Sequence, residues 1–310
     1  MTKQWIRKCA LSIEGGGGSL DLSDLRIRFL IEQSNTQRPN AANITITNVS
    51  KQTAQAIKEE GKTVSLEAGY QGGYGLIFKG DIIQKRYGRE NPVDTYLGIV
   101  AGSGDRAYNF AVVNKTLAAG HTFRDQVEEV LKVMKPFGVT AGLISDLGNQ
   151  KMPRSRTLFG MARDVLRGIG LSTRTDWSIQ NDKLQMLAQA GMSGEAFVLN
   201  AATGLIGMPV QTINGILVKC LLNARIKPGS RIQIDQKSIQ QAIFSPNYTA
   251  ERVNSMFPSI DPDGFYKAVI VEHSGDTRGG PWYTDINCIR ADGQTQIPLY
   301  YGATGVVIPE

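Results

Sequence analysis

The feature of this 310-residue sequence that most limits its fold is an internal repeat. Residues 61–67 (GKTVSLE) and 229–235 (GSRIQID) share a turn glycine, an alternating strand pattern and a closing carboxylate. Because self-similarity restricts architecture more tightly than composition does, we predict that one β-module occurs twice. Two further β-rich runs follow each copy in the same order, at 78–85 and 95–102 in the first and at 265–273 and 284–291 in the second, with Thr95 matched to Thr284.

The segment that holds the first copy has an apolar period of two. From Leu25 to Ile31, and again around Ile44, Val64 and Tyr96, apolar residues alternate with polar ones, which is the pattern of half-buried strands. We therefore predict an antiparallel sheet that curls into a barrel or sandwich. Turn-forming residues separate the runs, at 38–40 (RPN), 71–73 (QGG) and 89–92 (RENP).

Three helices are predicted from their spacing and end signals. Ser50 caps a short helix over 51–58, and Gly61 follows it. Thr122 caps a second helix, which Pro136 ends. The third ends near Gly168 and Gly170. The apolar face of the second helix comprises Phe123, Val127, Val130, Leu131 and Met134, and that of the third Leu158, Met161, Ala162, Val165, Leu166 and Ile169.

The chain is longer than one hydrophobic core usually supports, so several domains are expected. We predict a β domain over 1–108, a two-helix α+β domain over 109–200 and a second β domain over 201–310, where alternation returns. The second β-module carries a longer insert at about 236–264, which contains three prolines and is predicted to be an irregular loop.

Composition is that of a folded protein, with 41% apolar and 20% charged residues. The net charge is +6, but Lys and Arg are scattered among carboxylates. The densest basic stretches, Lys3–Lys8 and Lys151–Arg156, are short and interrupted, which argues against nucleic-acid binding. The sequence contains no run of about 18 apolar residues, so no membrane span is predicted. The apolar stretch near the N-terminus is too short for a signal peptide.

The residues that usually hold metals are sparse. Cys9, Cys220 and Cys288 are widely spaced and lie among apolar neighbours, so we interpret them as buried reduced thiols. The only histidines are His121 and His273, and no pair of these residues has the spacing of a zinc site. We predict no metal and no cofactor.

Three glycine-containing segments have alternative interpretations. Residues 60–63 (EGKT) lack the upstream glycine and the strand-to-helix order of a phosphate loop, so they predict a strand start. Residues 102–107 (GSGDRA) match a dinucleotide fingerprint only in spacing, because no βαβ unit follows, and predict a tight turn. Residues 15–19 (GGGGS) predict a hairpin loop, which we hypothesise becomes ordered on assembly.

No catalytic constellation is apparent. A Gly-x-Ser-x-Gly elbow is absent, and we interpret His121 and His273 as turn residues. The adjacent carboxylates Glu128 and Glu129 diverge on a helix, and the run 261–263 (DPD) is typical of a turn. Carboxylates that folding brings together would escape this search, so a glycosidase remains an alternative.

Five stretches, taken in order along the chain, resemble a known family. Residues 40–50 (NAANITITNVS), 66–70 (LEAGY) and 77–81 (IFKGD) resemble the opening domain of bacteriophage baseplate hub proteins of contractile-tailed phages. Residues 203–209 (TGLIGMP) and 273–283 (HSGDTRGGPWY) look like the second barrel of that family.

This resemblance implies a mainly β fold with an α+β insertion, in which two tube-type antiparallel β-barrels flank a small two-helix domain. It implies a homotrimer whose six similar barrels join the sixfold tail tube to the threefold central spike. Expected partners are the tube or tube-initiator protein, the spike, other baseplate proteins and the tape measure protein, while DNA passes through the lumen without specific binding.

The resemblance also implies a virion protein of the tail baseplate that assembles in the host cytoplasm. It implies no catalytic residue. Two alternatives stay open: a cell-wall hydrolase or peptidase of the tail, and the spike-hub component of a type VI secretion or contractile injection machine.

Overall fold

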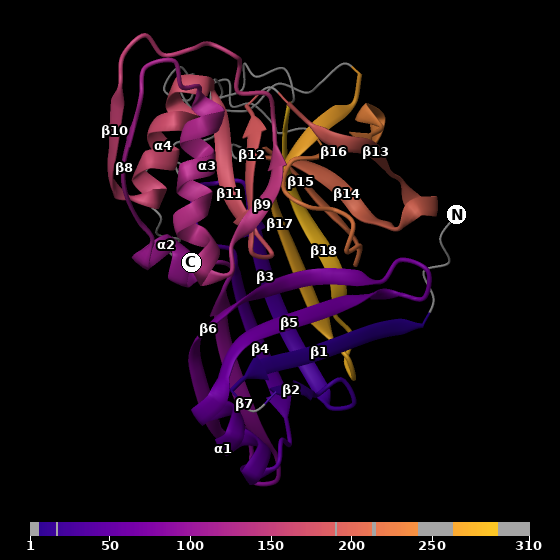
Figure 1. Ribbon diagram of the computed structural model, residues 1–310. Helices are drawn as coiled ribbons and strands as arrows, with labels where there is room; N and C mark the ends of the chain where they lie inside the picture. The colour runs from indigo at the N-terminus through magenta and orange to yellow at the C-terminus, as the bar shows by residue number, and fades with distance from the viewer. Residues whose placement is uncertain (1–5, 17, 190, 213–214, 241–262, 291–310) are drawn as a thin grey trace, which may run out of the picture.

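A computed structural model describes residues 6–16, 18–189, 191–212, 215–240 and 263–290 (Figure 1). The chain is mainly β, and most of its strands belong to one 13-stranded sheet. A two-stranded and a three-stranded sheet lie in the middle part. Within the described residues, no helix is long and apolar enough to cross a bilayer.

The first part of the chain forms the lower half of Figure 1. Strict alternation places one face of each strand in a common core, which includes Ile27, Ile44, Val64 and Ile99. Its elements are β1 (Arg7–Gly15), β2 (Gly18–Asp21), β3 (Arg26–Ser34), β4 (Ala41–Thr47), α1 (Lys51–Glu60), β5 (Gly61–Tyr70), β6 (Gly75–Arg89) and β7 (Thr95–Gly102).

Local signals in this part are confirmed. The hydroxyl of Ser50 accepts a hydrogen bond from the backbone N–H of Thr53 and caps α1, which ends before Gly61. Strands β1 and β2 form an antiparallel hairpin that pairs Gly15 with Gly18, as the glycine run predicts. Gly104 has a φ of 62°, so the turn after β7 requires a residue that tolerates left-handed backbone.

The middle part packs α3 and α4 together at the upper left of Figure 1. Its core is a separate cluster that includes Val130, Leu166, Trp177 and Leu184. The elements are α2 (Asp105–Phe110), β8 (Val112–Leu117), α3 (Phe123–Met134), the 3₁₀ turn Lys135–Phe137, β9 (Thr140–Ile144), β10 (Arg156–Met161), α4 (Ala162–Thr173), β11 (Thr175–Gln180) and β12 (Lys183–Ala188).

Of the two helices predicted in this part, α3 is confirmed and α4 is corrected. Thr122 and Asp125 form a reciprocal capping box at the start of α3. Helix α4 begins only at Ala162 and continues past both glycines to Thr173, where Arg174 takes a left-handed conformation. Leu158 and Met161 instead lie in β10, where Leu158 is buried in the core of this part. The spacing of Leu158 from the residues of α4 fits a helix. A strand that leads into a helix can bury a residue on the same side, so the spacing alone assigned Leu158 to the wrong element.

The third part returns to β structure around a cluster that includes Val218, Ile232, Val271 and Ile286. The three clusters follow the three predicted domains approximately: Leu222, Ala224 and Trp282 belong to the first cluster, Ala107 to the second and Leu199 to the third. The boundaries after residues 108 and 200 stay predictions. The elements are β13 (Ser193–Leu199), the 3₁₀ turn Ala201–Thr203, β14 (Leu205–Thr212), β15 (Gly215–Leu221), β16 (Ser230–Ile234), the 3₁₀ turn Gln236–Ser238, β17 (Phe265–Asp276) and β18 (Trp282–Arg290).

The strand order reproduces the internal repeat. In the first module the pairing runs β5-β6-β7-β4-β3, and in the second it runs β16-β17-β18-β15-β14. The second strand of each order carries a register irregularity at the same place, which lies between Ile82 and Gln84 in β6 and between Ala268 and Ile270 in β17. The repeated unit is therefore a five-stranded module; its closure into two barrels stays a prediction.

The residue match between the last strands of the two modules needs correction. Registers across the irregularities make Ile99 equivalent to Ile286, whereas matching Thr95 to Thr284 would place Ile99 against Cys288. The error is a slip of two residues. Such a slip keeps every side chain on its face of the sheet, so an alternating pattern cannot detect it. Most of the insert at 236–264 lies outside the described residues.

Candidate assembly interface

Strand β17 joins the two modules. Its first residues pair with β16 of its own module, where Lys267 faces Arg231. Beyond the irregularity it leaves β16 and pairs antiparallel with β3 of the first module, from Ile270 opposite Ser34 to Asp276 opposite Arg28. Because β17 contributes to both modules, the backbone ladder continues from one to the other. Figure 1 shows β17 and β18 running from the third part down into the first.

Side chains reinforce this joint. Arg26 donates through Nε and Nη2 to the two oxygens of Asp276, at 3.2 and 2.7 Å. This bidentate bond lowers the pKa of Asp276. The indole of Trp282 meets the ring of Phe29 edge-on at 5.4 Å, and a Cβ on Gly275 would collide with both rings. The joint is therefore closely packed and electrostatically matched.

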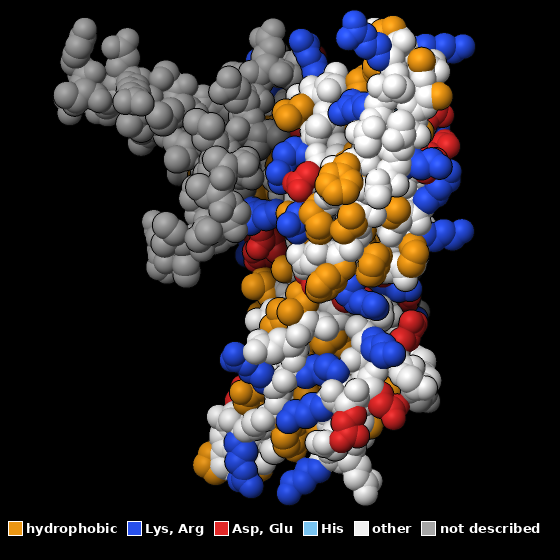
Figure 2. All heavy atoms as spheres, turned by 60° about the vertical axis from the view of Figure 1, so that its left-hand side comes forward, with side chains coloured by type: hydrophobic (Ala, Val, Ile, Leu, Met, Phe, Trp, Pro, Cys, Tyr) orange, Lys and Arg blue, Asp and Glu red, His pale blue; other side chains and the backbone are white. Residues whose placement is uncertain are grey.

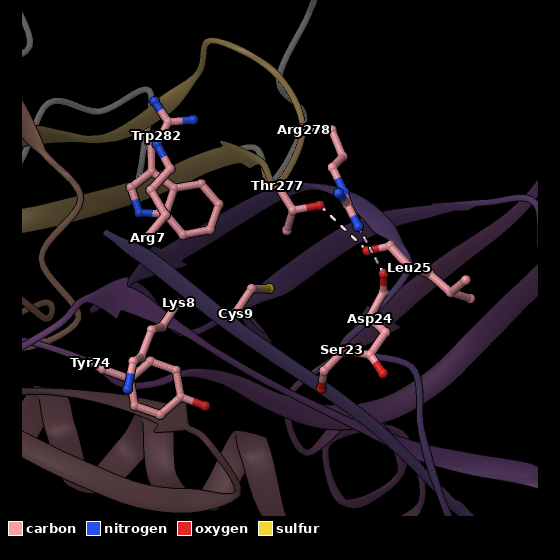
Figure 3. Close-up of a pocket in the computed structure, with 10 residues that line it drawn as sticks. All are labelled: Arg7, Lys8, Cys9, Ser23, Asp24, Leu25, Tyr74, Thr277, Arg278 and Trp282. Carbon is pink, nitrogen blue, oxygen red and sulfur yellow. Dashed lines mark hydrogen bonds between the residues drawn. The ribbon is translucent and has the colours of Figure 1, made fainter. Parts of the chain in front are cut away.

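A cleft of about 490 Å³ opens beside this joint (Figure 3). Its two arginine side chains are bound to backbone. Arg7 donates to the carbonyls of Gly279 and Gly280 at 2.6 and 2.9 Å, and Arg278 donates to that of Asp24 at 3.2 Å. The residues that line it are Arg7, Lys8, Cys9, Ser23, Asp24, Leu25, Tyr74, Thr277, Arg278 and Trp282.

These bonds hold the turn between β17 and β18 against the first module. Burial raises the pKa of the Cys9 thiol to about 12, so it stays protonated near neutral pH and is a poor nucleophile. The chemistry of the cleft is thus that of a structural contact.

A tight turn docks the middle part onto the first module. Gln180 donates to the carbonyl of Ser34 at 2.8 Å and accepts from Asn40 at 2.7 Å. The carboxylate of Asp182 accepts from the backbone N–H of Gly104 at 3.0 Å. Burial raises the pKa of Asp182 to about 6, and the nearby carboxylate of Asp81 contributes. These contacts are polar and short, so they fix the orientation of the two parts.

The middle part also contacts the second module through a buried cation. The ammonium of Lys267 donates to the carbonyls of Ala188 and Gln189 at 3.0 and 3.1 Å, and only 1% of the residue is exposed. Burial lowers its pKa, while the charge of Asp176 opposes this shift. All three parts are therefore connected directly to one another.

Several strands of the large sheet pair with another strand on one side alone, and two of them are relevant to assembly. Among the residues that the structure describes, the second half of β6 pairs with β7 alone, although the equivalent half of β17 pairs with a strand on each side. Strand β14 is the last strand at one end of this sheet and pairs with β15 on one side. Unpaired strand edges readily accept another chain.

The middle part exposes a small apolar surface. Phe110, Val112 and Phe159 are 66%, 53% and 76% exposed, and the last two lie on the outer side of the β8–β10 pair. Figure 2 shows hydrophobic side chains gathered on the upper half of this side of the molecule. Apolar side chains grouped in this way are typical of contact surfaces.

The two histidines lie in different parts of the molecule. His121 lies in the turn before α3, as predicted, and its Nδ1 is 2.7 Å from the carbonyl oxygen of Ala118. His273 is not a turn residue: it is buried inside β17, with Nδ1 2.9 Å from the hydroxyl of Thr284. Burial lowers its pKa to about 3. The run Ser-Gly-Asp after it suggested a turn, but the strand continues to Asp276.

The carboxylates considered from sequence have separate partners. Glu128 pairs with Arg124 at 3.6 Å, and Glu129 pairs with Lys132 at 2.7 Å. Asp261 lies outside the described residues. Across the described part of the chain, no three residues of the types His, Cys, Asp and Glu are grouped to hold a metal ion. Sequence reasoning missed the joint residues Arg26, Asp182 and Lys267, whose partners are far away along the chain.

Comparison with known proteins identifies the fold. No family model matches the sequence, and no curated protein matches it. Solved structures do match. The 43 kDa tail protein of prophage MuSo2 from Shewanella oneidensis aligns with 93% of this chain and 100% of its own, at 9% identity and a TM-score of 0.56. The tail protein from Neisseria meningitidis MC58 aligns with 94% and 100%, at 10% identity and 0.57.

A third solved structure comes from a secretion machine. The Escherichia coli c3393 protein, described as a type VI secretion component similar to the T4 tail proteins gp27 and gp5, aligns over 93% of this chain and 76% of its own. The identity is 9% and the TM-score 0.50. The chain therefore has the fold of phage tail and type VI secretion proteins.

Proposed function

We propose that this chain, which has a phage tail protein fold, is the baseplate hub that joins the tail tube to the central spike. The observation that carries the proposal is the repeated five-stranded module, with one copy joined to the next by the β17–β3 ladder. Three chains would supply six similar modules around a threefold axis. Such a homotrimer presents sixfold spacing to a tube and threefold symmetry to a spike.

The proposed partners follow from this geometry. The tube or tube-initiator protein binds one end of the ring and the spike binds the other, with other baseplate proteins around it and the tape measure protein and DNA in the channel. The hub is a structural protein of the virion, assembled in the host cytoplasm, and has no catalytic activity. DNA slides through without specific contacts, because tight phosphate binding would oppose its passage.

A second candidate is the spike-hub component of a type VI secretion or contractile injection machine. The likeness to the E. coli secretion component favours it. Both functions place a ring between a tube and a spike, and only the surrounding machine differs. Genes for capsid proteins beside the gene for this chain support the phage hub, and their absence supports the secretion component.

The experiment that tests the hub is electron microscopy of the purified protein, scored on end-on views, together with its mass by light scattering. The expected result is a ring of six lobes with threefold symmetry and three times the 33.8 kDa of one chain. A particle of another symmetry contradicts the proposal. Peptidoglycan turnover by the same preparation would instead establish a hydrolase, and no turnover is expected.

A further inference from the structure

Strand β14 occupies in the second module the place that β3 occupies in the first. Gln211 pairs with Ile216, which pairs with Cys288. In the first module Ile31 pairs with Ala42, which pairs with Ala101. Cys288 and Ala101 are equivalent, because each pairs with the residue just before the register irregularity of its neighbouring strand, β17 or β6. Gln211 is therefore the counterpart of Ile31, and Thr212 that of Glu32.

The edge of β3 shows which backbone groups make a joint between modules. Thr277 donates to the carbonyl of Ile27, and Asn35 donates to that of Val269. The backbone N–H and C=O groups of every second residue of a strand point to the same side, so Phe29 and Ile31, like Ile27, direct theirs toward β17. Their counterparts on the outer side of β14 are Pro209 and Gln211.

These two counterparts are already bonded, to a residue of the same chain. Gln211 donates to the carbonyl of Gln240 at 3.0 Å, and Gln240 donates to the carbonyl of Pro209 at 2.7 Å. The contact is an isolated parallel bridge between Val210 and Gln240. Within the described residues, Gln240 thus binds the N–H of Gln211 and the carbonyl of Pro209, whose counterparts in the first module point toward β17.

The strand that could replace Gln240 is the second half of β6. It is the counterpart of the part of β17 that pairs with β3, and in the described structure its side away from β7 faces no strand. By the same register, Tyr87 of one copy would face Gln211 of another, and Arg86 would face Thr212. The partner that fits β14 is therefore a second copy of this chain.

We propose that Gln240 is a removable cover of the β14 edge, which the β6 strand of a second copy displaces on assembly. This inference rests on the proposed function, because it concerns how the trimer closes. A covered edge keeps the free protein from pairing with other chains. Within the described residues, two hydrogen bonds hold Gln240 on the edge, while Ile239 before it stays buried in the third core cluster; the joint that replaces the bridge would extend along β14 to Thr212.

The first test fixes the cover in place. A disulfide in Val210→Cys/Gln240→Cys joins directly paired residues, so its geometry is favourable. We expect the oxidised protein to keep the mass of one chain and the reduced protein to reach three times that mass, by light scattering at equal concentration. The matched control is Thr116→Cys/Thr157→Cys, another directly paired and exposed site far along the chain, which should assemble in both states.

The outcomes separate the inference from the proposed function. Equal assembly of the oxidised and reduced protein refutes the cover and leaves the trimeric hub standing. Protein that remains monomeric in both states, control included, refutes the trimer and the inference with it.

The second test does not depend on the cover variant folding. Arg86→Cys/Thr212→Cys should form a covalent trimer on a non-reducing gel, because the equivalent pair in the first joint, Glu272 and Glu32, is a closely spaced non-hydrogen-bonded pair. Gln84→Cys/Thr212→Cys, displaced by two residues on the same face, is the control and should not cross-link. Equal cross-linking of both pairs, or of neither in a protein that is trimeric, refutes the proposed register.

Discussion

Replacing Asp182 with Asn should stabilise the protein above pH 6. The carboxylate is half-buried at the docking turn, and burial raises its pKa from 3.8 to about 6. The ionised form is therefore disfavoured in the folded state. The penalty is absent below pH 4, grows as pH rises, and is complete above pH 6.

The size of this effect follows from the shift in pKa. Each pKa unit corresponds to about 1.4 kcal/mol, which gives about 3 kcal/mol for the full shift. Solvent reaches part of the side chain, so we reduce the expected gain to about 1–2 kcal/mol. The Asn amide oxygen can still accept from the N–H of Gly104, and Asn tolerates the backbone φ of 60° at this position.

The assay is urea unfolding of the wild type and the variant from pH 4 to pH 8. The two free energies of unfolding should agree near pH 4 and separate through pH 6. Asp24→Asn, at an exposed carboxylate, is the control and should remain within about 0.5 kcal/mol of the wild type at every pH. Parallel curves for the Asp182 variant, or a variant that is less stable at pH 8, would refute the reasoning.

Three further predictions concern the joints. Gly275→Ala should lower the free energy of unfolding by about 1–3 kcal/mol because its Cβ collides with two aromatic rings, whereas Gly280→Ala, with open space, should unfold like the wild type. His273→Gln should reduce acid sensitivity: its folded pKa of about 3 lies below the unfolded 6.5, so the wild type should lose about 2 kcal/mol between pH 7 and pH 5, and equal losses in both proteins would contradict this. Lys267→Met removes two hydrogen bonds to part-buried carbonyls, of which that of Ala188 keeps the N–H of Gly191 as a donor, and should cost about 1 kcal/mol in urea unfolding; a gain in stability would show that burying the ammonium costs more than its hydrogen bonds return.

Local features of the fold could be predicted from the sequence where short-range physics determines them. The caps at Ser50 and Thr122 depend on residues three positions apart, and both are confirmed. Strand alternation reflects which face is buried, and it identified β3 to β7 and β16 to β18. The position of His273 could not be found in this way, because a Ser-Gly-Asp run is compatible with a turn and the strand through it depends on β3 and β18 on either side.

The joints between parts depend on contacts that sequence patterns do not encode. Arg26 and Asp276 stand 250 positions apart, and nothing in the neighbourhood of either predicts the other. Lys267 lies among apolar residues at the start of β17, from Phe265 to Val271, and its acceptors belong to the middle part. The repeat predicted that two modules exist, but the strand that links them became visible only in three dimensions.

The shared strand β17 also sets the order in which the chain can fold. Strand β3 is synthesised early, but its outer edge stays unpaired until Asp276 has been made, and Trp282 can join the first core only after that. Contacts so far apart along a chain are slow to form, and an incomplete sheet edge attracts other chains in the meantime. The first module can therefore be completed only after almost the whole described chain has been synthesised. Until then, a chaperone bound at β3 would protect it from aggregation.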